Sequence, residues 1–128
     1  MSLPPGIPLG ILLRSAGHEA GHYALMLATA AAAIGRPVVI FATNGGCNLL
    51  LKRTPLLADP REDLLARRGV VGIAPLLDAA IDLGVRRIVC EAGLRAESLE
   101  EAPLAEGVEV AGVVTFLTAV GHGQLLSL

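Results

Sequence analysis

Short aliphatic runs alternate along this chain with longer segments of mixed polarity. The runs at residues 10–14, 37–42 and 85–90 are rich in Val, Ile and Leu, a pattern typical of strands buried on both faces of a parallel sheet. Two shorter runs follow at residues 108–110 and 124–128. The alternation therefore predicts five strands with helices between them.

The segments between these runs predict the helices. Residues 23–33 are nearly all small or apolar, so we expect a helix buried on more than one side, with Ser15 as its cap and Gly35 at its end. A short polar helix is expected after Asp59, which is a good capping residue. In that helix we expect Pro60 as the first residue and Glu62 as the capping-box partner of Asp59. Elsewhere we expect a loop at 43–48, a helix at 75–84, an acidic connection with one helical turn at 97–107, and a helix at 113–119.

Strands joined by helices imply crossover connections, a mostly parallel sheet and helices on both of its faces. We expect a single domain over residues 1–128, with an α/β fold of the flavodoxin or Rossmann type. Ligands of such sheets bind beyond the carboxyl ends of the strands. Three segments share that edge of the predicted sheet, at residues 15–22, 44–47 and 90–95.

Composition narrows the class of protein. Hydrophobic residues make up 53% of the chain and charged residues 17%, which excludes a disordered chain because so much apolar surface must be buried. The three aromatic residues and the formal net charge of −2 argue against direct nucleic-acid binding. The high apolar fraction favours a homo-oligomer, since a small monomer covers such a surface poorly.

Nothing in the sequence predicts a membrane protein or a secreted one. The longest apolar run, at residues 23–34, is shorter than the roughly 20 residues of a membrane span. The first residues lack the pattern of a signal peptide, and two distant cysteines do not resemble the disulfide framework of a small secreted domain. We therefore expect a cytoplasmic protein.

The strongest candidate for chemistry is Cys90, at the end of the predicted third strand. A thiol at a strand's carboxyl end, near helix amino termini and a cation such as Arg95, is where a thiolate can be stabilised and reached by a partner. The neighbouring Glu91 opposes that effect. The alternative is a buried cysteine that serves only as a small hydrophobic residue.

Cys47 lies on the predicted loop at the same edge of the sheet. It is a candidate resolving thiol or second sulfur carrier for Cys90, although a disulfide would need the two Cα atoms within about 7 Å. An incidental loop cysteine is the alternative. Gly45 and Gly46 precede it, and their backbone amides could bind an anion or simply form a tight turn. No dinucleotide fingerprint or Walker lysine is present, so we expect no cofactor.

The segment from His18 to His22 matches the HExxH spacing of zinc hydrolases, because Glu19 follows the first histidine. Both imidazoles would share one face of a helix, and His122 or a cysteine could supply a third ligand. Against this interpretation, glycines weaken the helix and the chain is short for a substrate cleft. We favour histidines that line the thiol pocket or cap the helix, and we expect no metal.

The sequence resembles the DsrE/DsrF-like family of sulfur-relay proteins, which includes TusD-like members and a branch labelled peroxiredoxin-like. The resemblance covers residues 10–128 and rests on Cys90, on Leu94 and Arg95 after it, and on the run at residues 107–113. The segments at 23–28 and 35–41 also fit. One departure is that Arg95 is followed by Ala and Glu, whereas family members commonly have Gly there.

The resemblance implies that Cys90 accepts sulfane sulfur as a persulfide and passes it to the next thiol of a relay. It also implies sulfur donor and acceptor proteins as partners, and assembly into trimers or hexamers. A non-catalytic binding or scaffold subunit with the same fold is the alternative function, and a histidine-bound, metal-dependent hydrolase is a third.

Overall fold

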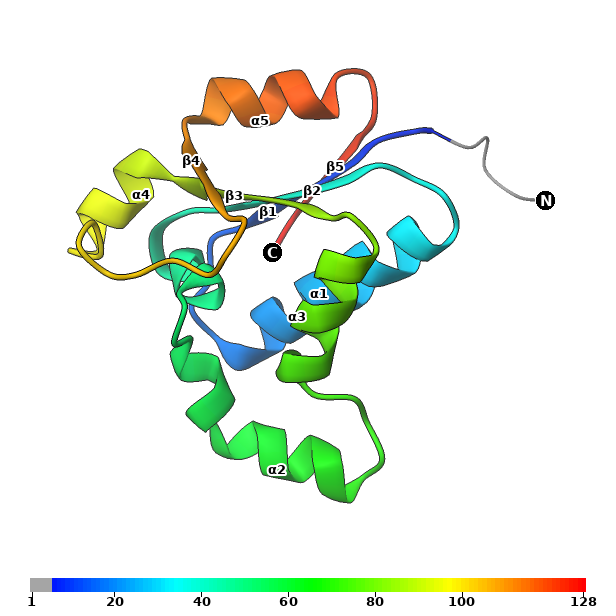
Figure 1. The fold of residues 1–128 in the computed structure, drawn as a ribbon, viewed down its shortest axis with the longest axis vertical. Coiled ribbons are helices and arrows are strands. Elements are labelled where there is room, and N and C mark those ends of the chain that lie inside the picture. Colours follow the sequence, from blue (N-terminus) through cyan, green and yellow to red (C-terminus); the bar gives the residue numbers. More distant parts are fainter. Residues whose placement is uncertain (1–5) are drawn as a thin grey trace.

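Five parallel strands form one sheet in the order β4-β3-β2-β1-β5 (Figure 1). The computed structural model describes residues 6–128. The strands are β1 (Leu9–Leu13), β2 (Val38–Ala42), β3 (Arg86–Cys90), β4 (Glu109–Ala111) and β5 (Gln124–Ser127). The first four follow one another across the sheet in chain order, and β5 returns to the free side of β1. This architecture confirms the predicted α/β fold with a five-stranded parallel sheet.

Helices lie on both faces of the sheet. They are α1 (His18–Ala33), α2 (Pro60–Arg67), α3 (Ile73–Asp82), α4 (Glu91–Ala96) and α5 (Val113–Val120), with 3-10 turns η1 (Asn44–Leu50) and η2 (Pro55–Ala58). The helices α1 and α3 pack together on one face, whereas α5 crosses the other face (Figure 1). The reason is topological: the chain advances from β1 to β4 in one direction and must run back over the sheet to reach β5.

Two apolar cores fill the space between these layers. The larger core lies between the sheet and the α1–α3 pair and includes the fully buried Leu25, Ile40 and Ile73. The smaller core lies under α5, where the rings of Phe41 and Phe116 stack with their centroids 4.9 Å apart. Each fully buried side chain of this size contributes roughly 1.5–3 kcal/mol to folding.

Local signals at three places misled the sequence prediction. Ser15 does not cap α1: the cap is Gly17, whose amide donates to the Ser15 hydroxyl at 3.2 Å. The predicted loop at 43–48 is wound into η1. The helical turn expected at 97–107 is wrong: those residues form turns, and the helix of this region is α4, which lies before them and is capped by the Cys90 side chain. The predicted cap Asp59 is confirmed, since its carboxylate accepts from the Arg61 amide at 2.8 Å.

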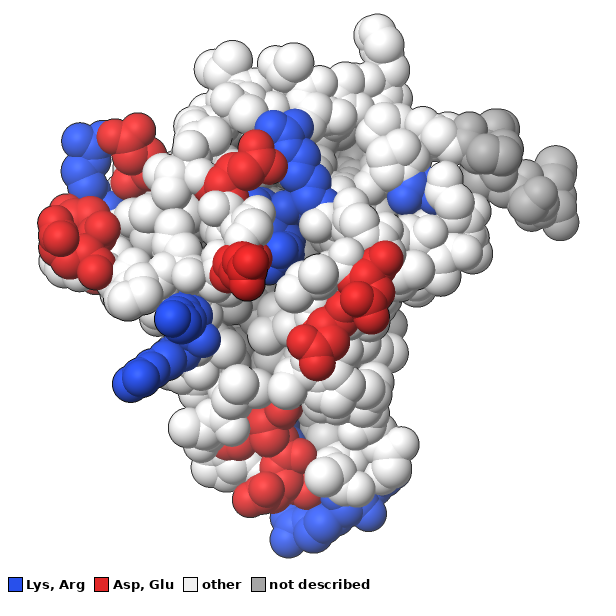
Figure 2. Space-filling model, viewed as in Figure 1, with Lys and Arg blue, Asp and Glu red and all other residues white. Residues whose placement is uncertain are grey.

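The surface over α5 carries no formal charge. Residues 110–128 contain no Asp, Glu, Lys or Arg, and Figure 2 shows uncharged surface over this helix. Val113, Val114 and Leu117 are exposed there, with 74% of Val114 accessible to solvent. Within residues 6–128, none of the helices has the length and apolar character that spanning a membrane requires.

Candidate functional site

The candidate site lies at the carboxyl rim, which we define as the ends of β1, β2 and β3 with the first residues of the segments that follow them. Parallel strands end at the same edge of a sheet, so α1, η1 and α4 all begin there. This places His18, Cys47 and Cys90 on the same rim of the molecule. Their individual contacts decide which of them can act together.

Cys90 is both the last residue of β3 and the cap of α4. Its sulfur accepts a hydrogen bond from the Gly93 amide at a distance of 3.4 Å. The side chain packs with Phe41, Ile88 and Phe116, and 8% of the residue stays accessible to solvent. An amide that donates to sulfur stabilises negative charge on it, so this position suits a thiolate or a persulfide anion.

Cys47 lies on η1 and is fully buried. Its thiol donates to the carbonyl of Ala42, 3.6 Å away. The pKa of Cys47 is raised to about 11, chiefly by burial and then by the charges of Cys90 and Glu97, against the opposing effect of the Cys47 and Cys90 amides. Cys47 is therefore a neutral thiol near neutral pH.

The strand register brings the two cysteines into one neighbourhood. Ala42, whose carbonyl holds the Cys47 thiol, pairs with Val89, the residue before Cys90. Beyond the strands, α4 presses on the segment that follows β2: a Cβ added at Gly93 would lie 2.5 Å from the amide nitrogen of Asn44. The sheet thus brings the segments that carry Cys47 and Cys90 together, with the Cys47 side chain in the larger core and the Cys90 side chain in the smaller one, although 42 residues lie between them in the sequence.

The two candidate glycines hold η1 against β1. The Gly46 amide donates to the carbonyls of Thr43 at 2.9 Å and Arg14 at 3.2 Å. The carbonyl of Gly45 accepts from the side-chain amide of Asn48 at 2.9 Å. The Gly46 amide is thus engaged inside the protein, and its role here is to pack the turn that carries Cys47.

Arg95 points toward a neighbour on its own helix. Its guanidinium pairs with the Glu91 carboxylate at 3.1 Å, one helical turn away, and both side chains are 63% exposed. Exposed pairs of this kind contribute little to stability. In this arrangement Arg95 neutralises the carboxylate next to Cys90 and makes no hydrogen bond to the sulfur itself.

The histidines of α1 form a separate group that we call the histidine brace: His18, His22 and Glu62. The Nε2 atom of His18 lies 2.6 Å from the Glu62 carboxylate, and Nε2 of His22 lies 2.8 Å from the carbonyl of Val71. The second Glu62 oxygen accepts from the Ile73 amide at 3.0 Å. The brace therefore ties α1 to α2 and to the start of α3.

The brace is not arranged as a metal site. The two imidazoles stack with centroids 5.8 Å apart, and the part of the chain described by the structure contains no cluster of three His, Cys, Asp or Glu positioned to hold a metal ion. His122 lies on an exposed turn after α5. Sequence reasoning missed the role of Glu62, which it assigned to a capping box, because its partner lies 44 residues earlier.

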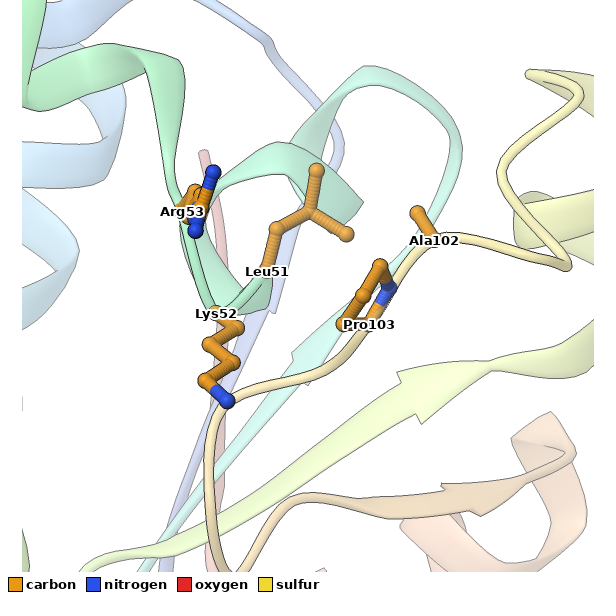
Figure 3. A pocket seen from close by; sticks show the side chains of 5 residues that line it. All are labelled: Leu51, Lys52, Arg53, Ala102 and Pro103. Carbon is orange, nitrogen blue, oxygen red and sulfur yellow. The ribbon is translucent and has the colours of Figure 1, made fainter.

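A hollow of about 320 Å³ lies beside the rim, where the chain after η1 meets the chain after α4 (Figure 3). Leu51 and Leu104 form an antiparallel bridge there, and the Lys52 amide donates to the Pro103 carbonyl at 2.9 Å. Lys52 and Arg53 line it, but neither cysteine does. This hollow is thus distinct from the surroundings of Cys90.

Comparison with known proteins agrees with this geometry. The chain resembles the ychN protein from E. coli, with a TM-score of 0.67 and 15% identity over 94% of this chain and 98% of that one. It also resembles MTH1491, a protein of unknown function from Methanobacterium thermoautotrophicum, with a TM-score of 0.57 and 18% identity over 94% and 98%. No curated protein matches in sequence. The model of the DsrE/DsrF-like family matches residues 9–127, and the chain belongs to that family.

Proposed function

We propose that this protein carries sulfane sulfur as a persulfide on Cys90 and passes it to the thiol of a partner protein. The observation that supports this most strongly is the position of the Cys90 sulfur. It lies at the carboxyl end of β3 and accepts a hydrogen bond from the Gly93 amide at 3.4 Å. That hydrogen bond favours the anionic forms of sulfur through which such transfers proceed. Membership of a family associated with sulfur relay agrees with this chemistry.

The proposed transfer balances without a cofactor. The Cys90 thiolate attacks the outer sulfur of a donor persulfide, and a new sulfur–sulfur bond forms as the donor's own sulfur–sulfur bond breaks. The donor leaves as a thiolate, and Cys90 holds the transferred sulfur. An acceptor thiolate then takes that outer sulfur in the same way. Both steps need protein partners with reactive thiols and a reducing compartment, which for this chain we propose is the cytoplasm.

Mass spectrometry tests the proposal directly. The purified protein is incubated with inorganic polysulfide, desalted without a reductant, and weighed intact. We expect the mass of one added sulfur atom per chain, mapped by peptide analysis to Cys90 and removed by a small thiol. A chain that gains no sulfur would rule out the carrier and favour the alternative described next.

The alternative is a non-catalytic binding or scaffold subunit with the same fold. Two observations favour it: only 8% of Cys90 is accessible to solvent, and α5 exposes apolar side chains on an uncharged surface. Exposed apolar patches of this kind mark interaction sites. A surface without charge allows two copies to meet without repulsion, so we propose that this face contributes to a homo-oligomer, a trimer or a hexamer, in either function.

Sedimentation measures that assembly. We expect the wild-type protein to sediment as a trimer or hexamer, and Leu117→Lys to shift it toward the monomer, because a lysine on the exposed side of α5 would have to be desolvated in the interface. Glu101→Lys, on a charged and exposed segment, is the matched control and should leave the assembly unchanged. A wild-type monomer at micromolar concentration would refute this proposal.

A further inference from the structure

Cys47 is a buried nucleophile for which the transfer described above has no use. It is the only other cysteine of the chain, it is fully buried, and its thiol is held by the Ala42 carbonyl at 3.6 Å. Its place beside Cys90 follows from two separate contacts, the pairing of Ala42 with Val89 and the close packing of Gly93 on Asn44. The turn η1, which carries Cys47, also contacts both β3 and α4, the two elements that meet at Cys90.

We propose that Cys47 is an internal resolving thiol, which removes unused sulfur from Cys90 as hydrosulfide and leaves a Cys47–Cys90 disulfide. The inference rests on the proposed function, because its substrate is the Cys90 persulfide. The Cys47 sulfur attacks the inner sulfur of that persulfide, a bond forms between the two cysteine sulfurs, and the bond to the outer sulfur breaks. The persulfide is itself the oxidised partner, so the step needs no external oxidant.

The protons balance within the pair. A neutral Cys47 thiol and a Cys90 persulfide anion together contain one proton, and the departing hydrosulfide anion takes it. The environment of Cys47 supplies such a neutral thiol, since burial raises its pKa to about 11. A small thiol or a reductase thiol would then reduce the disulfide and return both cysteines to their starting form.

The surroundings of Cys47 make this step slow compared with transfer to a partner. The charge of Glu97 and that of Cys90 both oppose a thiolate at Cys47. On α4, the charges of Glu91 and Arg95 pair with each other at the surface. Because its pKa is raised, Cys47 is mainly a neutral thiol at neutral pH, and thiolates rather than thiols are the effective nucleophiles. Sulfur therefore stays on Cys90 long enough to meet an acceptor.

The experiment follows the sulfur after loading. Protein loaded with inorganic polysulfide is desalted without oxygen and kept at neutral pH with no acceptor, and released hydrosulfide and intact mass are measured over time. For the wild type we expect one hydrosulfide per lost sulfur and a final mass two hydrogens below that of the reduced protein. Peptide mapping should find a Cys47–Cys90 disulfide. In Cys47→Ser we expect sulfur loss at least about tenfold slower, and no disulfide.

Two further measurements separate the outcomes. Cys47→Ala repeats the test with a residue that cannot donate to Ala42, and the disulfide assay on the wild type needs no substitution at all. If Cys90 loads but the wild type and both variants lose sulfur at the same rate without a disulfide, the resolving role is wrong and the carrier function stands. If Cys90 never loads, the carrier function fails and the resolving role with it.

Discussion

Replacing Cys90 with serine is expected to abolish sulfur loading and to leave the fold in place. The serine hydroxyl can accept the hydrogen bond from the Gly93 amide, so the cap of α4 is retained while the nucleophilic thiol is lost. The measurement is the intact mass after treatment with inorganic polysulfide. We expect a fall from one added sulfur per chain to none, with the circular dichroism spectrum unchanged.

The matched control for this substitution is Val120→Thr. Val120 lies in the same apolar core as Cys90, and threonine there introduces a buried hydroxyl into that core without removing the thiol. That variant should lose some stability, by about 1–2 kcal/mol, and should still load one sulfur. A Cys90→Ser protein that gains a sulfur atom as readily as the wild type would show that the carrier lies elsewhere.

The substitution Gly46→Ala is expected to destabilise the protein more than any other single methyl group added at the rim. The new Cβ would lie 2.1 Å from the carbonyl oxygen of Leu13 and 2.7 Å from its carbonyl carbon. That oxygen also accepts a hydrogen bond from the Thr43 amide at 2.9 Å, so the end of β1 cannot move without breaking this link to the residue that follows β2. We expect the free energy of unfolding to fall by about 3 kcal/mol or more, which thermal denaturation would show as a fall in Tm of roughly 10 °C or more.

Gly112→Ala is the control for that measurement. Gly112 caps α5 with a φ of −100°, and a Cβ there would meet nothing within 4 Å. The free energy of unfolding of the Gly112→Ala variant should stay within about 0.5 kcal/mol of the wild-type value. Equal melting temperatures for Gly46→Ala and the wild type would mean that η1 can move away from β1, contrary to the packing described above.

The strands could be predicted from the sequence because each central strand is buried on both faces and therefore reads as an unbroken apolar run. The run at residues 37–42 contains β2 whole, and Cys90 ends its strand as expected. The cap at Asp59 was also predictable, because capping depends on residues that are neighbours in the chain. Such features need no knowledge of the tertiary structure.

The rest of the site depends on contacts between distant parts of the chain. The sequence predicts Cys47 on a loop after one strand and Cys90 at the end of the next, but only the strand order, with β3 beside β2, brings the two segments together. The winding of residues 44–50 into a 3-10 turn follows from packing on β1, which no local propensity indicates. The pairing of His18 with Glu62 is equally remote from any sequence pattern.

The histidine brace has a consequence for how the molecule opens. Leu65 is the one buried residue of α2, so this helix is attached to the body by that side chain, by the Glu62 carboxylate with its two partners, and by the exposed Arg61–Glu19 ion pair. Local unfolding costs least where few apolar contacts must be broken. The stretch from Asp59 to Gly72 can therefore detach as a unit while the sheet and its cysteines stay packed, which makes it the natural place for proteases to cut and for insertions to be tolerated.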